Sequence, residues 1–307
     1  MFFPPVTPRA LVRPLVSVAA TLLLLTGVTW AATAAPEREV SQVRGESQVR
    51  TTNRAPVAHF GVATLNLRKG MRVAGMRHDI GQVIGGRASV IGFQERLFSK
   101  PALRASLPKS WALLMPDGPT GTDDNPIAFD KSVWKLEKTW SALLTGTTWR
   151  RYTGQVAHDQ YGVVAVLRHR KTGHTIRAVS FHLPNHLHNR HSGGPNYANR
   201  AGVQAMWRMA ASIRSLEENT PEEHQFVAMC DCNVTENRDL GNDLVKGRIT
   251  KPLRLETNYS ADDRHRGSGI DYVMGERASD FRIRNFRFFR HMVTDHPGVV
   301  ATFARRR

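Results

Sequence analysis

The 307-residue sequence contains only two cysteines, Cys230 and Cys232. They stand two positions apart in the stretch VAMCDCNVTEN, after an apolar run that predicts a β-strand. On a regular strand, residues two apart have Cα atoms about 7 Å from each other, at or beyond the limit for a disulfide. Two thiols also fall short of the four ligands of a structural zinc site. We therefore expect neither a disulfide nor a zinc site here, and both cysteines to be small, buried apolar residues.

Long hydrophobic runs are absent after the first 35 residues. The apolar segment 15–30 follows Arg9 and Arg13 and precedes the small residues of AATAAP, which is the arrangement of a secretory signal peptide. An uncleaved membrane anchor is the alternative, since the segment is only slightly shorter than a spanning helix. We predict a signal peptide at residues 1–35, a secreted protein, and no stable membrane span once the signal is cleaved.

Acidic residues are few: the chain has 26 Asp and Glu against 43 Lys and Arg, a formal net charge of +17. The signal segment removes two arginines and no acid, so the mature chain keeps +15. Such a charge attracts polyanions, including nucleic acid, anionic lipid surfaces and cell-wall polymers. Solubility or genome composition explains a basic chain equally well, so charge alone does not decide the partner.

Motifs for nucleotide cofactors and for serine hydrolases are also missing, because the sequence has no P-loop, no Rossmann glycine-rich loop and no G-x-S-x-G elbow. No Pro/Ser-rich linker or internal repeat divides the chain after its start. Residues 36–55 are polar and without periodicity, so we predict a flexible lead-in there. Residues 56–307 are then one domain, which we expect to be monomeric.

Strand-like runs recur through that domain, whereas only two segments have helical spacing. The expected helices cover 76–84 and 199–218, and the sequence HRKTGHT predicts a hairpin between two strands. Many strands with few helices indicate two packed sheets flanked by helices, an α/β-sandwich. The expected strands are 57–67, 88–95, 125–130, 161–170, 174–183, 225–233, 269–275, 281–289 and 298–303.

Polar residues with catalytic chemistry follow the apolar strands, where each strand ends. A single Asp or Asn in such a place is usually a turn residue, but here the pattern repeats along the chain. Carboxylates and amides are ligands for Mg²⁺, Mn²⁺ or Ca²⁺ rather than zinc. The residues are Asn66, Glu95, His182, Asp231, Asn233, Asp271, Asp295 and His296.

This set has the parts needed for metal-assisted hydrolysis of a phosphate ester. A divalent cation held by carboxylates would contact a phosphate oxygen, and Asp231 would orient and deprotonate a water for in-line attack. His182 and His296 would stabilise the phosphoryl charge or transfer protons. Asp271 would fix the tautomer of His296 through a carboxylate–imidazole hydrogen bond.

The motifs TLNLR, IGFQE, VSFHLPN, MCDCNV, GIDYVM and TDHPGVVATF resemble, in the same order, those of the endonuclease/exonuclease/phosphatase superfamily. The resemblance covers residues 57–303. It implies a four-layer α/β-sandwich with two mostly antiparallel sheets and an active site at one end. It also implies that Glu95 is the main metal ligand, with Asn66 and Asp295 assisting. Asp231 and Asn233 would position the water and the phosphate.

Two positions depart from the family pattern. Cys230 stands where family members usually have glycine. Family members also commonly have an Arg or Ser shortly before the aspartate of GIDY, and Ser268 and Gly269 occupy that stretch here. Arg264 or Arg266 offers a phosphate contact nearby, although arginines in polar loops are more often solvated. These departures affect the fine positioning of the site and leave the family resemblance intact.

Three further patterns have weaker functional interpretations. The histidines of HLPNHLHNRH (His182, His186, His188 and His191) suggest zinc, but solvated loop histidines are more common. NVT at Asn233 and NYS at Asn258 match the glycosylation pattern, and a glycan on Asn233 would block the site. The run FRIRNFRFFR, which contains four arginines, fits a phosphate-backbone track or simply an exposed strand face.

The sequence thus predicts a secreted, divalent-metal-dependent phosphodiesterase, with Mg²⁺ (or Mn²⁺ or Ca²⁺) as cofactor and DNA or RNA as substrate. A lipid or small-molecule phosphoesterase on the same fold is the alternative, such as a sphingomyelinase-like enzyme or a sugar or inositol phosphatase. A non-catalytic binding protein of this fold is a third hypothesis. It is disfavoured because every site residue is present.

Overall fold

The computed structural model describes residues 59–68, 70–95, 100–118, 124–146, 159–187, 195–196, 199–234, 255–257, 269–276 and 280–305. The expected signal peptide, the lead-in and the residues Arg264 and Arg266 lie outside the described residues. Among the described helices, none is long and apolar enough to cross a membrane.

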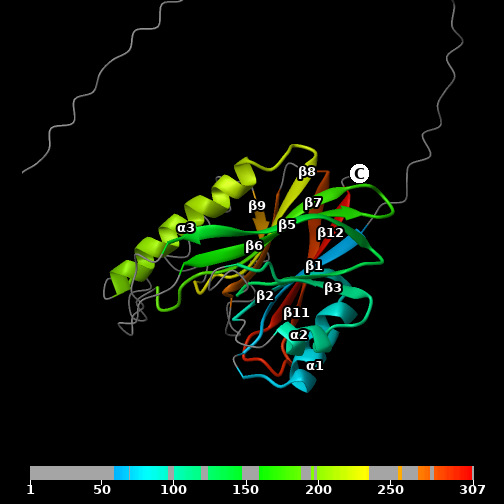
Figure 1. Cartoon of the computed structure of the whole chain (residues 1–307), viewed down its shortest axis with the longest axis horizontal. Coiled ribbons are helices and arrows are strands. Elements are labelled where there is room, and N and C mark those ends of the chain that lie inside the picture. Colours follow the sequence, from blue (N-terminus) through cyan, green and yellow to red (C-terminus); the bar gives the residue numbers. More distant parts are fainter. Residues whose placement is uncertain are drawn as a thin grey trace, which may run out of the picture. The chain divides into compact units, whose positions relative to one another are not determined.

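Two six-stranded sheets form the centre of the domain (Figure 1). The first sheet has the spatial order β11-β12-β1-β2-β4-β3, and the second has the order β5-β6-β7-β8-β10-β9. The strands of the first sheet are β11 (Phe281–Phe289), β12 (Gly298–Arg305), β1 (His59–Asn66), β2 (Ala88–Gln94), β4 (Ile127–Asp130) and β3 (Trp111–Leu114). Those of the second are β5 (Trp134–Thr145), β6 (Gln160–His169), β7 (Thr175–His182), β8 (His224–Asp231), β10 (Asp271–Glu276) and β9 (Leu255–Thr257).

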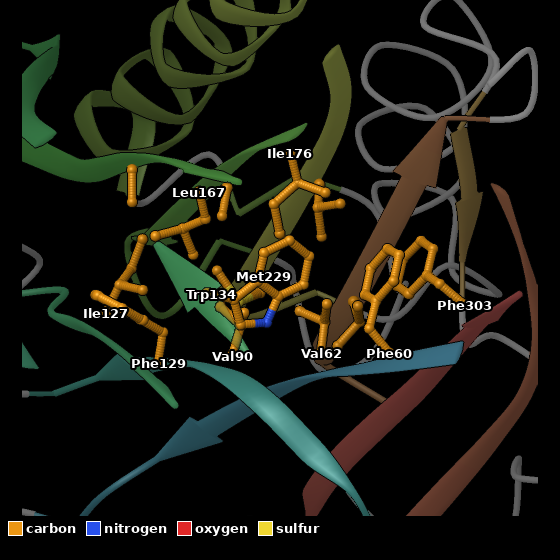
Figure 2. Close-up of a cluster of buried hydrophobic side chains, with 14 of the residues drawn as sticks. Phe60, Val62, Val90, Ile127, Phe129, Trp134, Leu167, Ile176, Met229 and Phe303 are labelled. Atoms are coloured by element: carbon orange, nitrogen blue, oxygen red, sulfur yellow. The ribbon is translucent and has the colours of Figure 1, made fainter. Parts of the chain in front are cut away.

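Apolar side chains from the inner faces of both sheets fill the space between them. Val62 and Val90 of the first sheet pack there with Ile176 and Met229 of the second, and all four are fully buried. Figure 2 shows these side chains together, with the indole of Trp134 among them. Strand alternation explains this core, since every second side chain of a strand points to the same face.

Helices cover the two outer faces, and they complete the four layers that the sequence predicts. Helix α1 (Val73–Gly85) and helix α2 (Lys100–Ser106) lie against the first sheet, and helix α3 (Arg200–Glu218) lies against the second (Figure 1). The apolar stripe of α3 is the expected one, with Met206 and Ile213 fully buried. The two-sheet α/β-sandwich is therefore confirmed.

Three strands and one helix were not expected from the sequence: β3, β5, β9 and α2. Strand β5 is long but irregular, because its pairing with β6 shifts register at two places. Each shift moves the following side chains to the other face. The alternation that predicts a strand is therefore interrupted twice along β5.

Two β–α–β units determine where the strand ends meet. Strands β1 and β2 are parallel and are joined through α1, and β7 and β8 are parallel and are joined through α3. The remaining strand pairs are antiparallel, as the resemblance implies. Because parallel strands end at the same edge, Asn66 lies opposite Gln94 and His182 lies opposite Asp231.

The two sheets approach each other closely at Gly92. A Cβ atom at Gly92 would lie 2.8 Å from Met229 Cβ and 2.9 Å from Ser180 Oγ. The change Gly92→Ala should therefore destabilise the protein by about 1–3 kcal/mol through overpacking. Urea unfolding gives the free energy of unfolding for this comparison.

Gly81, in the middle of α1, is the matched control. A Cβ atom there meets nothing within 4 Å. Gly81→Ala should stabilise the protein by about 0.5–1 kcal/mol, because alanine loses less backbone entropy in a helix. Equal stabilities for the two variants would contradict the close packing at Gly92.

Candidate active site

Strands β1 and β2 deliver Asn66 and Glu95 to one end of the domain. Asn66 is fully buried, and its Nδ2 donates a hydrogen bond of 2.7 Å to Asp231 Oδ2 in the second sheet. The Oδ1 atom of Asn66 is also buried and accepts no hydrogen bond from the described residues. Glu95 follows β2 with a left-handed backbone (φ 56°), an uncommon conformation for a side chain other than glycine. Such conformations cluster at functional sites, where the surrounding structure enforces them.

Strands β7 and β8 deliver His182, Asp231 and Asn233. His182 Nε2 lies 3.3 Å from Asp231 Oδ2 and 2.8 Å from Asn233 Nδ2. The backbone N–H of Asn233 donates to Asp231 Oδ1 at 2.9 Å, and its Nδ2 donates to the carbonyl of Leu183 at 2.8 Å. Asn233 also has a positive φ of 52°. The chain therefore turns sharply after Asp231, and this turn aims the amide at His182.

Asp231 is a buried carboxylate with partners from both sheets; its side chain is 1% exposed. Burial by itself would raise the pKa of this carboxyl, but the charge and hydrogen bond of His182, together with His296 and the Asn233 N–H, lower it below the ordinary value. Burial likewise lowers the pKa of His182, and the charge and hydrogen bond of Asp231 outweigh that effect and raise it. Both shifts reflect the attraction between the Asp231 carboxylate and the His182 ring.

Asp271 and His296 form a second pair next to Asp231. His296 Nδ1 lies 2.9 Å from Asp271 Oδ2 and 4.0 Å from Asp231 Oδ2. Burial raises the pKa of Asp271 to about 7 against the hydrogen bond from His296. Burial lowers the pKa of His296, but the hydrogen bond to Asp271 and the charges of Asp271 and Asp231 raise it to about 9. The pairing predicted for these two residues is therefore present in the geometry.

Donor atoms for a cation gather in two overlapping groups. Ligand atoms of Glu95, His182 and Asp231 lie within 4.8 Å of one another, as do those of Asp231, Asp271 and His296. The buried, unpaired Oδ1 of Asn66 and these carboxylates are hard oxygen donors, which suit Mg²⁺, Mn²⁺ or Ca²⁺. Asp295 falls in neither group: its side chain is exposed, and its Oδ1 lies 3.4 Å from Thr294 Oγ1. The role of each residue as ligand or catalyst remains a prediction.

Asp79 is a residue that the sequence analysis missed. It lies on α1 and is fully buried, and its two oxygens accept the N–H groups of Val293 (2.7 Å) and Thr294 (2.9 Å). Thr294 Oγ1 in turn donates to the carbonyl of Asn66 at 2.9 Å. Asp79 thus fastens the segment before Asp295 and His296 to α1, and Thr294 fastens it to the end of β1. The available signal was an acid on the apolar stripe of α1, three residues after Met76 and one before Ile80.

The prediction for the two cysteines is half wrong. Both are fully buried among apolar residues, as expected, but they form a disulfide with a Cα–Cα distance of 5.4 Å. The distance between Cα atoms two residues apart depends on the backbone of the residue between them, so Asp231, the last residue of β8, must be less extended than a regular strand residue. The bond lies beneath α3, on the side away from the Asp231 carboxylate. Cys230 therefore occupies the place of the usual glycine as half of a disulfide.

The weaker sequence patterns contribute little to this site. His188 and His191 of the histidine run and the glycosylation pattern at Asn258 lie outside the described residues. At Asn233, the side-chain amide is already held by Leu183 and His182, so this NVT pattern does not present a free acceptor for a glycan.

Comparisons with known proteins place this geometry in a known fold. No family model and no curated protein matches the sequence. Among solved structures, an endonuclease/exonuclease/phosphatase protein of Bacteroides vulgatus is similar with a TM-score of 0.60 and 17% identity, over 81% of this chain and 100% of that one. This chain has the endonuclease/exonuclease/phosphatase fold.

Two further structures share this fold with 13% identity. The mannosyl-6-phosphatase of Bacteroides thetaiotaomicron has a TM-score of 0.58 over 80% of this chain and 99% of its own. D. rerio TDP2, solved with a single-strand DNA product, has a TM-score of 0.57 over 80% of this chain and 99% of its own. The fold implied by the sequence motifs is thereby confirmed.

The change Asp79→Ala should loosen the segment that carries Asp295 and His296. It leaves the N–H groups of Val293 and Thr294 without their acceptor, and each buried donor left unpaired costs about 1–3 kcal/mol. Urea unfolding should show this loss, and amide hydrogen exchange at Thr294 should become faster.

His78→Ala is the control for Asp79. His78 Nδ1 contacts Asp79 Oδ1 at 3.0 Å, but its side chain is about half exposed. Its removal should cost less than about 1 kcal/mol, as for exposed ion pairs. Equal stability and equal exchange in the two variants would show that Asp79 does not hold the segment.

Proposed function

We propose that this protein is a divalent-metal-dependent phosphodiesterase that hydrolyses nucleic acid. The supporting observation is the Asp231 centre, where one buried carboxylate contacts Asn66 from one sheet and His182 from the other, with the Asp271–His296 pair beside it. Its setting in the endonuclease/exonuclease/phosphatase fold, which a phosphatase and TDP2 share, supports phosphoester chemistry.

The donor atoms at this end of the domain fit a hard cation. Glu95 and the free Oδ1 of Asn66 would hold Mg²⁺ or Mn²⁺, with Asp295 joining them if its exposed carboxylate turns inward. The ion would supply Lewis-acid polarisation of a phosphate oxygen and would neutralise the charge that develops there.

The protein's own side chains account for the proton transfers. A water attacks phosphorus in line with the leaving oxygen, loses a proton toward Asp231, and forms the new P–O bond as the opposite P–O bond breaks. His182, held by Asp231 and Asn233, binds a phosphoryl oxygen. His296 uses Nδ1 for Asp271, so its Nε2 is the atom that protonates the leaving oxygen.

Nucleic acid is the substrate that the charge favours. The predicted mature chain carries +15, and a polyanion gains most from such a field. TDP2, which shares the fold, is bound to a DNA product in its structure. The alternative is a phosphatase acting on a sugar or lipid phosphate, which the fold of the mannosyl-6-phosphatase supports.

Secretion is part of the proposal. The signal-like residues 1–35 support it, and so does the Cys230–Cys232 disulfide, since disulfides persist in oxidising compartments. N-terminal sequencing of protein recovered from culture medium should give a start near residue 36. A chain that stays with the membrane and keeps its N-terminus would instead support the anchor.

The direct test is nicking of plasmid DNA with Mg²⁺ or Mn²⁺ and its arrest by a chelator. His296→Ala should lower the rate by about 100- to 10,000-fold, the usual range for a group that transfers a proton. His182→Ala should lower it by about 100- to 1,000-fold, as is usual for the loss of a donor to a charged oxygen in the transition state. Asp271→Asn should lower it by about 10- to 100-fold, as is usual for a residue that orients another.

His291→Ala is the matched control, because this exposed histidine lies in the same segment as His296 but outside the site. Its rate should equal that of the wild type. Cleavage of a phospholipid or a sugar phosphate in place of DNA and RNA would select the alternative substrate class. Equal rates for His291→Ala and His296→Ala would contradict the assigned role of His296.

A further inference from the structure

Strand β11 forms an exposed edge of the first sheet, and all of its charged residues are arginines. It pairs with β12 on one side and lies at the end of the strand order. Its arginines, Arg282, Arg284 and Arg287, are all exposed. The run Phe281–Thr294 contains no acidic residue.

A register shift explains how these arginines all remain outside. The pairing of β11 with β12 shifts between Ile283 and Asn285, so Arg284 is an extra residue without a cross-strand partner. The apolar residues of the strand, Ile283, Phe286 and Phe288, are half-buried against the core between the sheets. The strand is therefore anchored by its apolar side chains, and its guanidinium groups face solvent.

The strands beside β11 do not neutralise this charge. Neither β12 nor β1 contains an acidic residue. The nearest acid in sequence, Asp280, contacts Arg305 at 3.5 Å. Arginine forms paired hydrogen bonds to phosphate, which lysine cannot do with its single ammonium.

Strand β5, one of the two edge strands of the second sheet, is an example of an edge whose charged residues are simply solvated. Strand β5 mixes both signs, with Lys135 and Lys138 around Glu137, and Glu137 pairs with Arg168 at 2.7 Å. Charged residues on edge strands commonly prevent association with other strands. A mixture of signs serves that purpose on β5, whereas β11 has only positive charge.

We propose that Arg282, Arg284 and Arg287 form a docking stripe for the sugar–phosphate backbone of a nucleic-acid strand. From Arg282 to Arg287 the stripe is about 17 Å long, which is the length of about five phosphates on one strand. Strand β11 also leads to the site, because Phe289 lies opposite Gly298, two residues after His296.

Nucleic acid fits this stripe better than a lipid surface does. The arginines lie in a line along one strand, and the phenylalanines between them pack inward rather than standing free to enter a bilayer. This inference rests on the proposed function and specifies where its substrate is held. Binding without metal tests the stripe separately from catalysis.

The test compares two triple variants in chelator with a fluorescent single-stranded DNA of about 20 nucleotides. The variant R282Q/R284Q/R287Q should raise the Kd about tenfold or more at moderate salt. Each phosphate contact on single-stranded DNA contributes about 0.7 to the slope of log Kd against log salt, so this slope should fall by about 2. The control K109Q/K131Q/K135Q removes the same charge from exposed lysines next to β3, β4 and β5, away from the β11 edge, and it should change the Kd less than about threefold.

A charge-retaining variant guards against a folding artefact. R282K/R284K/R287K should restore the wild-type salt dependence and most of the lost affinity, since the phosphate contacts keep their charge and lose only the paired hydrogen bonds of arginine. With metal, all three variants should hydrolyse bis(p-nitrophenyl) phosphate at the wild-type rate, because none of the changed residues belongs to the site.

Several outcomes would overturn the stripe. If R282Q/R284Q/R287Q and K109Q/K131Q/K135Q lose the same affinity for DNA, the effect is one of net charge and not of the stripe. If the Kd of R282Q/R284Q/R287Q equals that of the wild type, the stripe does not bind DNA. Loss of binding to phosphatidylserine vesicles with DNA binding intact would assign the surface to lipid. Failure of the wild type to hydrolyse any phosphoester would refute the proposed function, while the binding comparison would still decide the stripe.

Discussion

The buried carboxylate of Asp231 joins the two sheets at the end where the candidate site lies. Asn66 reaches it from the first sheet, and His182 and Asn233 reach it from the second. A charge taken out of water is costly unless it is paired and hydrogen-bonded. The neighbouring side chains are therefore interdependent: each one satisfies Asp231 and is in turn oriented by it. His296 completes this arrangement at 4.0 Å, with its other contact to Asp271.

The spacing of the sheets makes this contact possible. Gly92 lets Met229 and Ser180 of the second sheet approach the backbone of β2. A buried polar link runs beside it, from Gln94 Nε2 to Ser180 Oγ (3.3 Å) and from Ser180 Oγ to the carbonyl of Phe93 (3.0 Å). Directional bonds in an otherwise apolar interior fix one sheet relative to the other more narrowly than apolar packing does. The ends of the parallel pairs β1/β2 and β7/β8 therefore lie side by side at the same end of the domain.

Periodic features of the fold and the site were readable from the sequence. Alternating apolar strands predict the two sheets. Polar residues with catalytic chemistry at strand ends predict a site at one edge, which the parallel pairs β1/β2 and β7/β8 provide because parallel strands end at the same edge. Features that depend on a local irregularity or a distant partner were not readable. The Cys230–Cys232 bond depends on the backbone at Asp231, between the two cysteines, being less extended than in a regular strand. In β5, register shifts interrupt the alternation from which a strand is predicted. Asp79 binds two backbone N–H groups more than 200 residues away, and the residues around Asp79 in the sequence do not indicate these contacts.

The electrostatics of the molecule connect the site with β11. A phosphodiester that enters the site meets the carboxylates of Glu95, Asp231 and Asp271, which repel it at close range unless a cation and the histidines compensate. The free energy of holding a polyanion must therefore come from elsewhere on the surface. Arginines along β11 supply it through contacts with phosphates that do not react. The carboxylates of the site activate water but repel a phosphodiester, so they cannot also supply the affinity for the substrate. The arginines of β11 supply that affinity at a distance from the reacting phosphate.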